Sequence, residues 1–163
     1  MSNKLTEKKI DKFHASIGRF VLTWAEVELD LDLLVLIVRR LSLRSDVQPR
    51  QELSEKIKFI RSEGATNPVL SAYRSIIERA TNEIRLLSDT RHDYVHDAAF
   101  KYAIKRQIPN VTMWRLLQPS KKSHRSPVKV TASLVNKTAD QLDVIGGKLL
   151  DLAEAINHID RLN

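Results

Sequence analysis

Residues 13–38 read FHASIGRFVLTWAEVELDLDLLVLIV, and this run establishes the class of fold. Apolar side chains recur in it at alternating intervals of three and four residues, in a pattern that begins at Ile10. Because this spacing matches one face of an α-helix, we predict a single long helix over residues 5–43. Its apolar face consists of Ile10, Phe13, Ile17, Phe20, Trp24, Val27, Leu31, Leu34 and Val38.

A short helix and then a third, longer helix are predicted downstream. The apolar residues from Leu53 to Ile60 have helical spacing, and Gly64 is expected to end that helix. Asn67 and Pro68 are residue types favoured at the N-cap and at the first position of a helix. The third helix is therefore expected to start at this pair.

The last helix is predicted from a capping-box pattern at Thr138 and Gln141. Apolar residues follow it at intervals of three and four up to Ile159. Gly146 and Gly147 lie inside this pattern, although glycine weakens a helix. We therefore expect a close contact between helices at the glycine pair.

The pattern changes between the third helix and the last. Residues 128–134 alternate apolar and polar side chains, as a strand does, and the β-rich residues 111–117 are its expected partner. We predict a β-hairpin around residues 108–135. The expected fold is an all-α, antiparallel bundle of four to five helices in one domain over residues 1–163, with the hairpin as an insertion.

The positive charge of the chain is concentrated in the same region. The formal net charge is +7, and the interval between Asp97 and Asp140 holds nine lysines and arginines and no acid. A basic segment of this kind, here about residues 101–137, either binds phosphate backbones, anionic lipids or acidic proteins, or only solubilises the chain. The residues expected to hold a phosphate backbone are Lys101, Lys105, Arg106, Arg115, Lys121, Lys122 and Arg125.

Composition excludes several classes of protein. There is no cysteine, which rules out disulfide scaffolds, thiol nucleophiles and cysteine-bound metals. The scattered His14, His124 and His158 lack the spacing of metal ligands, so we expect no metal and no cofactor. The first residues are charged and no apolar run is long enough to span a membrane, so we expect a soluble cytoplasmic protein.

Two charged residues fall inside apolar helix faces. On a helical wheel, Glu28 lies about 40° from Trp24, and Arg91 lies about 20° from Ile84 in the third helix. An unpaired buried charge is very costly, so we predict a buried ion pair between Glu28 and Arg91. Such a pair either fixes the packing register or serves a function.

Arg91 also begins the segment with the densest chemistry in the chain, RHDYVH at residues 91–96. Arginine grips a phosphate through paired donors, and histidine transfers protons near neutral pH. Together they suffice for RNA cleavage without a metal, in which the neighbouring 2′-OH attacks the phosphate. An arginine followed five residues later by a histidine is nevertheless a common string, so its context matters.

This segment resembles the R-x4–6-H motif of the HEPN superfamily, whose members are all-α bundles. The stretch from Gly18 to Glu28, with an aromatic residue four positions before an acid, is also similar to the first helix of small HEPN-like proteins. The resemblance implies a metal-independent endoribonuclease in a toxin–antitoxin or anti-phage defence setting. It further implies RNA as substrate, a homodimer in which two motifs form a composite site, and an antitoxin protein as a possible partner.

Residue roles follow from the same resemblance. Arg91 would hold the scissile phosphate, His96 would act as base or acid, and His92 would orient the RNA or the catalytic pair. Glu28 would position Arg91. Position 98 is Ala98, whereas toxins silenced by tyrosine modification often carry H-x-Tyr, so that mode of silencing is not expected.

Two other functions stay open on the sequence. One is a non-catalytic helical adaptor that binds RNA or a protein, in which the pair of Arg91 and Glu28 is structural. The other is a DNA-binding regulator that uses the basic hairpin. An enzyme needs His96 exposed beside Arg91, whereas an adaptor would tolerate its loss.

Overall fold

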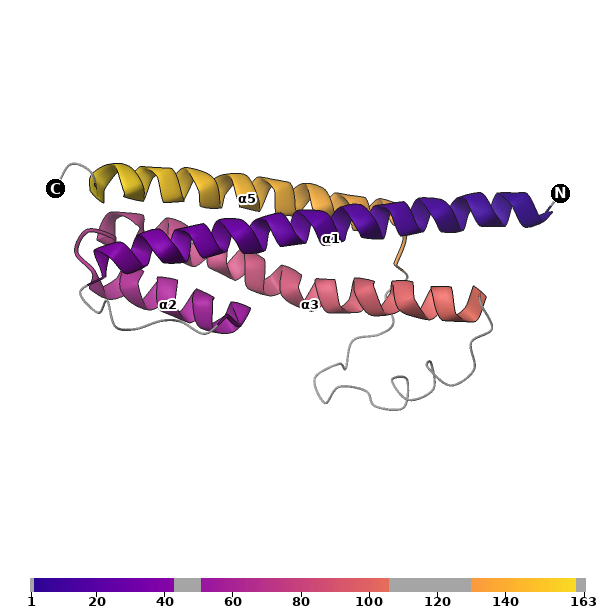
Figure 1. The fold of residues 1–163 in the computed structure, drawn as a ribbon, viewed down its shortest axis with the longest axis horizontal. Helices are drawn as coiled ribbons and strands as arrows, with labels where there is room; N and C mark the ends of the chain where they lie inside the picture. Colours follow the sequence, from indigo (N-terminus) through magenta and orange to yellow (C-terminus); the bar gives the residue numbers. More distant parts are fainter. Residues whose placement is uncertain (1, 43–50, 106–129, 161–163) are drawn as a thin grey trace.

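A computed structural model describes residues 2–42, 51–105 and 130–160, with side-chain surroundings for residues 11–42, 51–91, 94 and 130–158. Within these ranges the chain forms α1 (Ser2–Leu41), α2 (Leu53–Thr66), the short 3-10 helix η1 (Ser71–Tyr73), α3 (Arg74–Lys105) and α5 (Ala132–Asp160) (Figure 1). No strand occurs in these ranges. The predicted all-α class is therefore confirmed for the described part of the chain.

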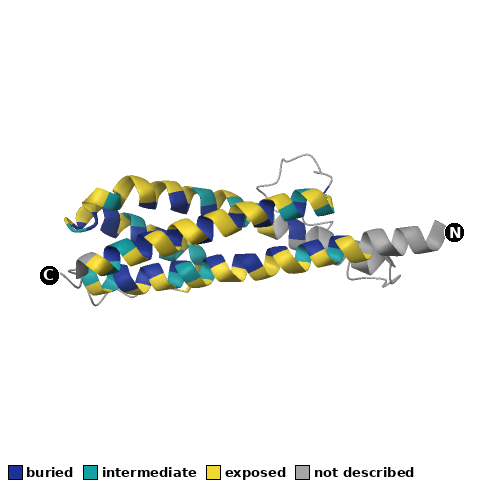
Figure 2. Ribbon diagram, turned by 90° about the horizontal axis from the view of Figure 1, so that it is seen from above, coloured by how far each residue is buried: buried dark blue, intermediate teal, exposed yellow. Residues whose placement is uncertain are grey.

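The long first helix is the centre of the fold. From Phe13 to Val38 its predicted apolar face is buried, apart from the partly buried Ile17, and Phe20, Leu31 and Leu34 are completely inaccessible to solvent. α1 makes its most extensive contact with α5. All four α-helices contribute to one hydrophobic core, and Figure 2 shows bands of buried and exposed residues along them.

The directions of the helices differ from the predicted antiparallel arrangement. Lys56 of α2 pairs with Asp32 of α1 at 2.5 Å, and the Asn67 side chain donates to the Leu41 carbonyl at 2.8 Å. The earlier residue of α1 contacts the earlier residue of α2, and the later residue contacts the later one. The two helices therefore run in the same direction. α5 also runs parallel to α1, and only α3 runs in the opposite direction (Figure 1).

The predicted strand before the last helix is wrong in its described part. α5 starts at Ala132, inside the predicted hairpin, rather than at the predicted capping box. Thr131 caps it, because its Oγ1 accepts the Leu134 N–H at 3.2 Å and its carbonyl accepts the Val135 N–H at 3.0 Å. The other predicted strand, residues 111–117, lies outside the described residues.

Thr138, the predicted cap, is a buried residue within α5. Its hydroxyl donates to the Leu134 carbonyl at 3.0 Å. Alternation over residues 128–134 was therefore a weaker signal than the spacing of three and four that joins Val135, Ala139 and Leu142, all completely buried.

Asn67 caps a turn rather than α3 itself. Its Oδ1 accepts the Val69 N–H at 3.0 Å, and the chain then passes through η1 before α3 begins at Arg74. α2 likewise continues past Gly64, which is buried against Ile77 of α3. The predicted boundary between the second and third helices is therefore correct to within one or two turns.

The expected close helix contact is confirmed for one glycine of the pair. A Cβ atom on Gly146 would lie 3.0 Å from Oδ2 of Asp30 and 3.7 Å from Cγ2 of Val27. A Cβ atom on Gly147 would meet nothing within 4 Å. Gly146 thus allows α5 to approach α1. None of the described helices is long and apolar enough to cross a membrane.

Candidate functional site

Arg91 of α3 lies next to two residues of α1. Its Nη1 atom is 3.9 Å from Oε1 of Glu28, and its Cζ atom is 5.4 Å from the centroid of the Trp24 ring. The guanidinium therefore makes a long ion pair and a cation–π contact. Trp24 and Glu28 are four residues apart, so they lie on the same side of α1 one turn apart. We call these three residues the arginine site.

The predicted pairing of Glu28 with Arg91 is confirmed, but its predicted burial is wrong. The Arg91 side chain is 49% exposed and that of Glu28 is 37% exposed. Long charged side chains extend their ends to water while their stems lie along an apolar surface. An exposed ion pair at this distance adds little stability, so it does not by itself explain the two residues.

Aromatic packing fixes the contact between α1 and α3 beside the arginine site. The ring of Phe20 lies 6.4 Å from that of Trp24 and meets that of Tyr94 edge-on at 5.2 Å. The buried Tyr94 hydroxyl shares a hydrogen bond of 2.9 Å with Oγ1 of Thr138 in α5. Tyr94 therefore ties α3 to both α1 and α5, three residues after the candidate phosphate ligand.

Trp24 is held by packing rather than by its polar group. The residue is 1% exposed, and its buried Nε1–H has no hydrogen-bond partner among the described residues. Leaving such a donor unpaired costs about 1–3 kcal/mol. Among aromatic rings, that of tryptophan binds a cation most strongly. The guanidinium over its face is therefore held more strongly by Trp24 than it would be by a phenylalanine.

His92 and His96 belong to α3, but their side chains lie outside the described part of the structure. Helical geometry places position 96 about 140° around the α3 axis from position 91 and about 7.5 Å along it. Positions 92 and 96, by contrast, are one turn apart on the same side of a helix. Positions 91 and 96 of one chain therefore do not share a helix face.

Only two of the seven residues predicted to bind a phosphate backbone lie in the described part of the chain. Lys101 and Lys105 lie in the last turns of α3, and their side chains are outside the described part. Arg106, Arg115, Lys121, Lys122 and Arg125 lie outside the described residues altogether. Their contribution to nucleic-acid binding stays a prediction.

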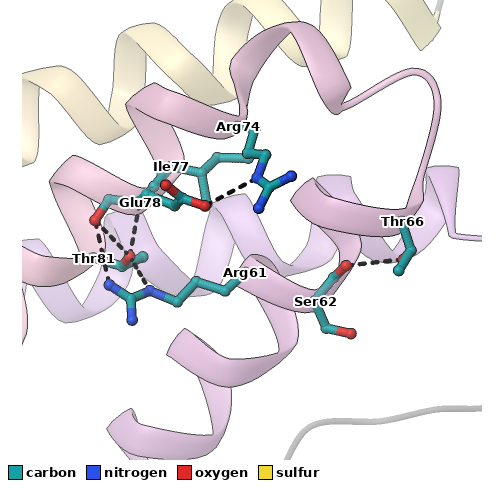
Figure 3. A network of polar contacts seen from close by, with 7 residues as sticks. All are labelled: Arg61, Ser62, Thr66, Arg74, Ile77, Glu78 and Thr81. Carbon is teal, nitrogen blue, oxygen red and sulfur yellow. Dashed lines mark hydrogen bonds and ion pairs between the residues drawn. The ribbon is translucent and has the colours of Figure 1, made fainter.

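The arginine between α2 and α3 has a purely structural set of partners (Figure 3). Arg61 donates from Nε to Oγ1 of Thr81 at 2.7 Å, from Nη2 to the Glu78 carbonyl at 3.3 Å, and also to Oδ1 of Asn82. Thr81 in turn donates to the Ile77 carbonyl at 2.7 Å. Arg61 therefore uses several of its N–H donors in hydrogen bonds within the fold. Arg91, in contrast, has as described partners only the distant Glu28 carboxylate and the Trp24 ring.

Among the residues whose side chains are described, two ionisable groups have clearly shifted pKa values, and both lie where α1 meets α5. The hydrogen bond to the Asp140 carboxylate raises the pKa of Arg19, which also pairs with Asp143. Burial raises the pKa of Asp30, and the nearby Glu26 adds to this effect. No group of three or more potential metal ligands occurs among the described residues.

The contact between Trp24 and Arg91 was missed by the sequence analysis, although its signal was present. Trp24 and Glu28 were both placed near the expected contact with α3, but the aromatic residue was assigned only to the core. The role of Tyr94 in packing was not predicted, because it lies among the polar residues of the R-x4–6-H segment. Both residues are large aromatics at core-facing helical spacing, the usual signal of packing.

Comparison with known proteins yields no match to a family model, a curated protein or a solved structure.

Proposed function

We propose that the chain is a metal-independent endoribonuclease of HEPN type, acting on RNA in a toxin–antitoxin or anti-phage defence setting. The observation that supports this most directly is the arginine site. Arg91, the first residue of the motif, is half-exposed on the bundle surface, with the Trp24 ring on one side and Glu28 at 3.9 Å. An arginine oriented in this way is suited to grip a phosphate.

In the proposed reaction the substrate supplies its own nucleophile. His96 accepts the proton of the ribose 2′-OH as its oxygen attacks the adjacent phosphorus. Arg91 stabilises the charge that develops on the phosphoryl oxygens. The bond to the 5′-oxygen breaks, and that oxygen takes up a proton. The products are a 2′,3′-cyclic phosphate and a 5′-hydroxyl end, and no metal or cofactor takes part.

Glu28 and Trp24 are positioning residues in this proposal. The Glu28 carboxylate orients the guanidinium, and its long distance leaves other N–H groups of Arg91 able to reach a phosphate. His92 would orient the RNA or the catalytic pair. The lysines and arginines of residues 101–125 would hold the RNA backbone, which predicts a steep loss of binding with added salt.

The geometry of α3 favours the composite site that the HEPN resemblance implies. Positions 91 and 96 lie about 140° apart on one helix, so the two side chains of a single copy do not both point toward one phosphate. In a homodimer with facing motifs, Arg91 of one copy and His96 of the other would meet at the substrate. An antitoxin protein would be a further partner.

The same geometry gives weight to a second candidate, a non-catalytic helical adaptor for RNA or protein. In that case Arg91, Trp24 and Glu28 only hold α3 against α1. The two functions differ in what happens when Arg91 or His96 is removed.

The deciding experiment is RNA cleavage in EDTA over a salt series, with analysis of the product ends. The wild type should cleave with EDTA present, and His96→Ala and Arg91→Ala should each lose roughly 100-fold or more in rate. His158→Ala and Arg79→Ala, which alter exposed residues of the same types elsewhere in the bundle, should cleave normally. Salt-sensitive RNA binding without cleavage would support the adaptor, and cleavage unaffected by His96→Ala would refute the proposed mechanism, in which His96 is the base.

A further inference from the structure

α1 carries a second apolar stripe that no described residue covers. Leu22 and Leu29 are each 68% exposed, Leu36 is 54% exposed and Leu33 is 40% exposed. We call these four residues the outer leucine stripe. Leucines that line up along one exposed side of a helix form an apolar patch, and such patches often mark interaction sites.

The outer leucine stripe lies opposite the core face of α1. Leu22, Leu29 and Leu36 repeat every seven residues, and so do the buried Phe20, Val27 and Leu34. The two series are offset by two residues, which is about 200° around a helix. α1 is therefore apolar on two opposite sides, as in helices that are buried within an assembly. Figure 2 shows exposed residues along the length of α1.

The residues beside the stripe permit close approach of another helix. Ala25 is exposed next to Leu22 and Leu29. Gly18, one turn before Leu22, is exposed, and a Cβ atom on it would meet nothing within 4 Å. Small residues between leucines let two helix backbones come near each other and let the leucines interdigitate.

The charges that flank the stripe are arranged for a second copy of the same chain. Glu26 lies seven residues before Leu33, and Arg40 lies seven residues after it, each about 10.5 Å along the helix. Both are exposed, and neither forms an ion pair among the described residues. If two α1 helices cross antiparallel with a two-fold axis at Leu33, each Glu26 meets the Arg40 of the other copy.

We propose that the outer leucine stripe is an interface between two copies of this chain, packed antiparallel about Leu33. In this arrangement Leu29 of one copy lies beside Leu36 of the other, and two ion pairs flank the apolar centre. A two-fold interface must be self-complementary, and this stripe satisfies that requirement in the spacing of its leucines and in its flanking charges.

This interface is separate from the arginine site. Glu28 is about 100° around α1 from Leu29, on the side that faces α3. The inference therefore does not rest on the proposed ribonuclease activity, and it would hold for an adaptor as well. A chain that also pairs through its motif would have two different two-fold interfaces and would form assemblies larger than a dimer.

Cysteine cross-linking tests both the face and the direction, because the chain has no cysteine of its own. Leu33→Cys should form a disulfide-linked dimer under a mild oxidant, since the two residues face each other at the axis. Leu22→Cys should not, because the two copies of position 22 would be about 33 Å apart. Leu86→Cys, at a leucine of α3 that is 64% exposed, controls for random collision.

Light scattering of the full chain over a dilution series completes the test. The wild type should be a dimer, or a larger assembly if the motifs also pair, and Leu33→Glu should weaken the contact at the stripe by roughly 100-fold or more, because two like charges would meet at the axis. Glu26→Arg and Arg40→Glu should each weaken the dimer several-fold, and the double variant should restore it. Leu86→Glu should leave the dimer unchanged.

Three results would overturn the proposal. The first is a wild-type chain that stays monomeric. The second is a dimer that survives Leu33→Glu without Leu33→Cys cross-linking, which would place the interface on another face. The third is cross-linking at position 22 as readily as at position 33, which would mean parallel helices. None of these depends on RNA cleavage, so the two proposals can fail separately.

Discussion

The two adjacent glycines of α5 offer a sharp test of how α1 and α5 pack. Substituting either with alanine makes the same chemical change in the same turn of the same helix. Gly147 is exposed and has open space around it, whereas a Cβ atom on Gly146 would lie 3.0 Å from Oδ2 of Asp30. We predict that Gly147→Ala stabilises the protein and that Gly146→Ala does not.

The magnitudes follow from two opposing contributions. Replacing glycine by alanine in a helix interior contributes about 1 kcal/mol, and Gly147→Ala should gain all of it. For a chain of 163 residues this corresponds to an increase in Tm of about 3 °C. At Gly146 the same gain is offset, because the Asp30 carboxylate must move by a few tenths of an ångström, at a cost of about 1 kcal/mol. The two variants should therefore differ by about 1 kcal/mol.

Urea titration and thermal melts followed by circular dichroism would measure both variants. A double-mutant cycle identifies the cause, because Asp30→Ala removes the atom that the new Cβ would meet. In that background Gly146→Ala should become stabilising, since Val27 at 3.7 Å is an ordinary contact. If Gly146→Ala stabilises the wild type as much as Gly147→Ala does, the close approach of α1 and α5 at this point is refuted.

Two other predictions concern polar groups at helix contacts. The folded-state pKa of Asp30 lies above its usual 3.8, so its contribution to stability is fully present below that value and is lost as pH rises through the folded pKa. Asp30→Asn should therefore raise the Tm at neutral pH by an amount that shrinks in acid, and a gain independent of pH would contradict this. Arg61→Ala should cost about 1–2 kcal/mol in urea titrations, because α2 loses its hydrogen bonds to α3. Arg79→Ala, at an exposed arginine of α3, should stay within about 0.5 kcal/mol of the wild type.

The sequence predicts the existence of the helices well, and it predicts their boundaries and relative directions less well. Spacing of three and four identified α1 and most of α3 and α5, because burial of one face imposes that period over many turns. The start of α5 was predicted too late for two reasons. The helix begins at a single capping residue, Thr131, and the short alternation of apolar and polar residues before it resembles a strand. The relative directions of α1, α2 and α5 could not be predicted, since they depend on tertiary contacts rather than on local pattern.

The error about Glu28 has a physical cause in the double-sided character of α1. The core face and the outer leucine stripe lie on opposite sides of α1, and most of its charged residues lie in two seams between them. Glu28 and Asp32 lie in one of these seams, where they pair with Arg91 of α3 and Lys56 of α2. A wheel drawn on the core face alone places Glu28 inside the apolar sector, although the residue lies at a partly exposed boundary.

The other seam faces α5 and completes this account of α1. Arg19 pairs there with Asp140 at 2.8 Å, and Asp30 lies against Gly146. Each polar seam of α1 thus meets a neighbouring helix within the chain, and the core face meets the interior. The outer leucine stripe is the one side of α1 for which the described residues provide no partner. Because the described contacts leave the stripe uncovered and its flanking Glu26 and Arg40 without an ion pair, a second copy of α1 is a partner that matches the stripe in both apolar spacing and charge.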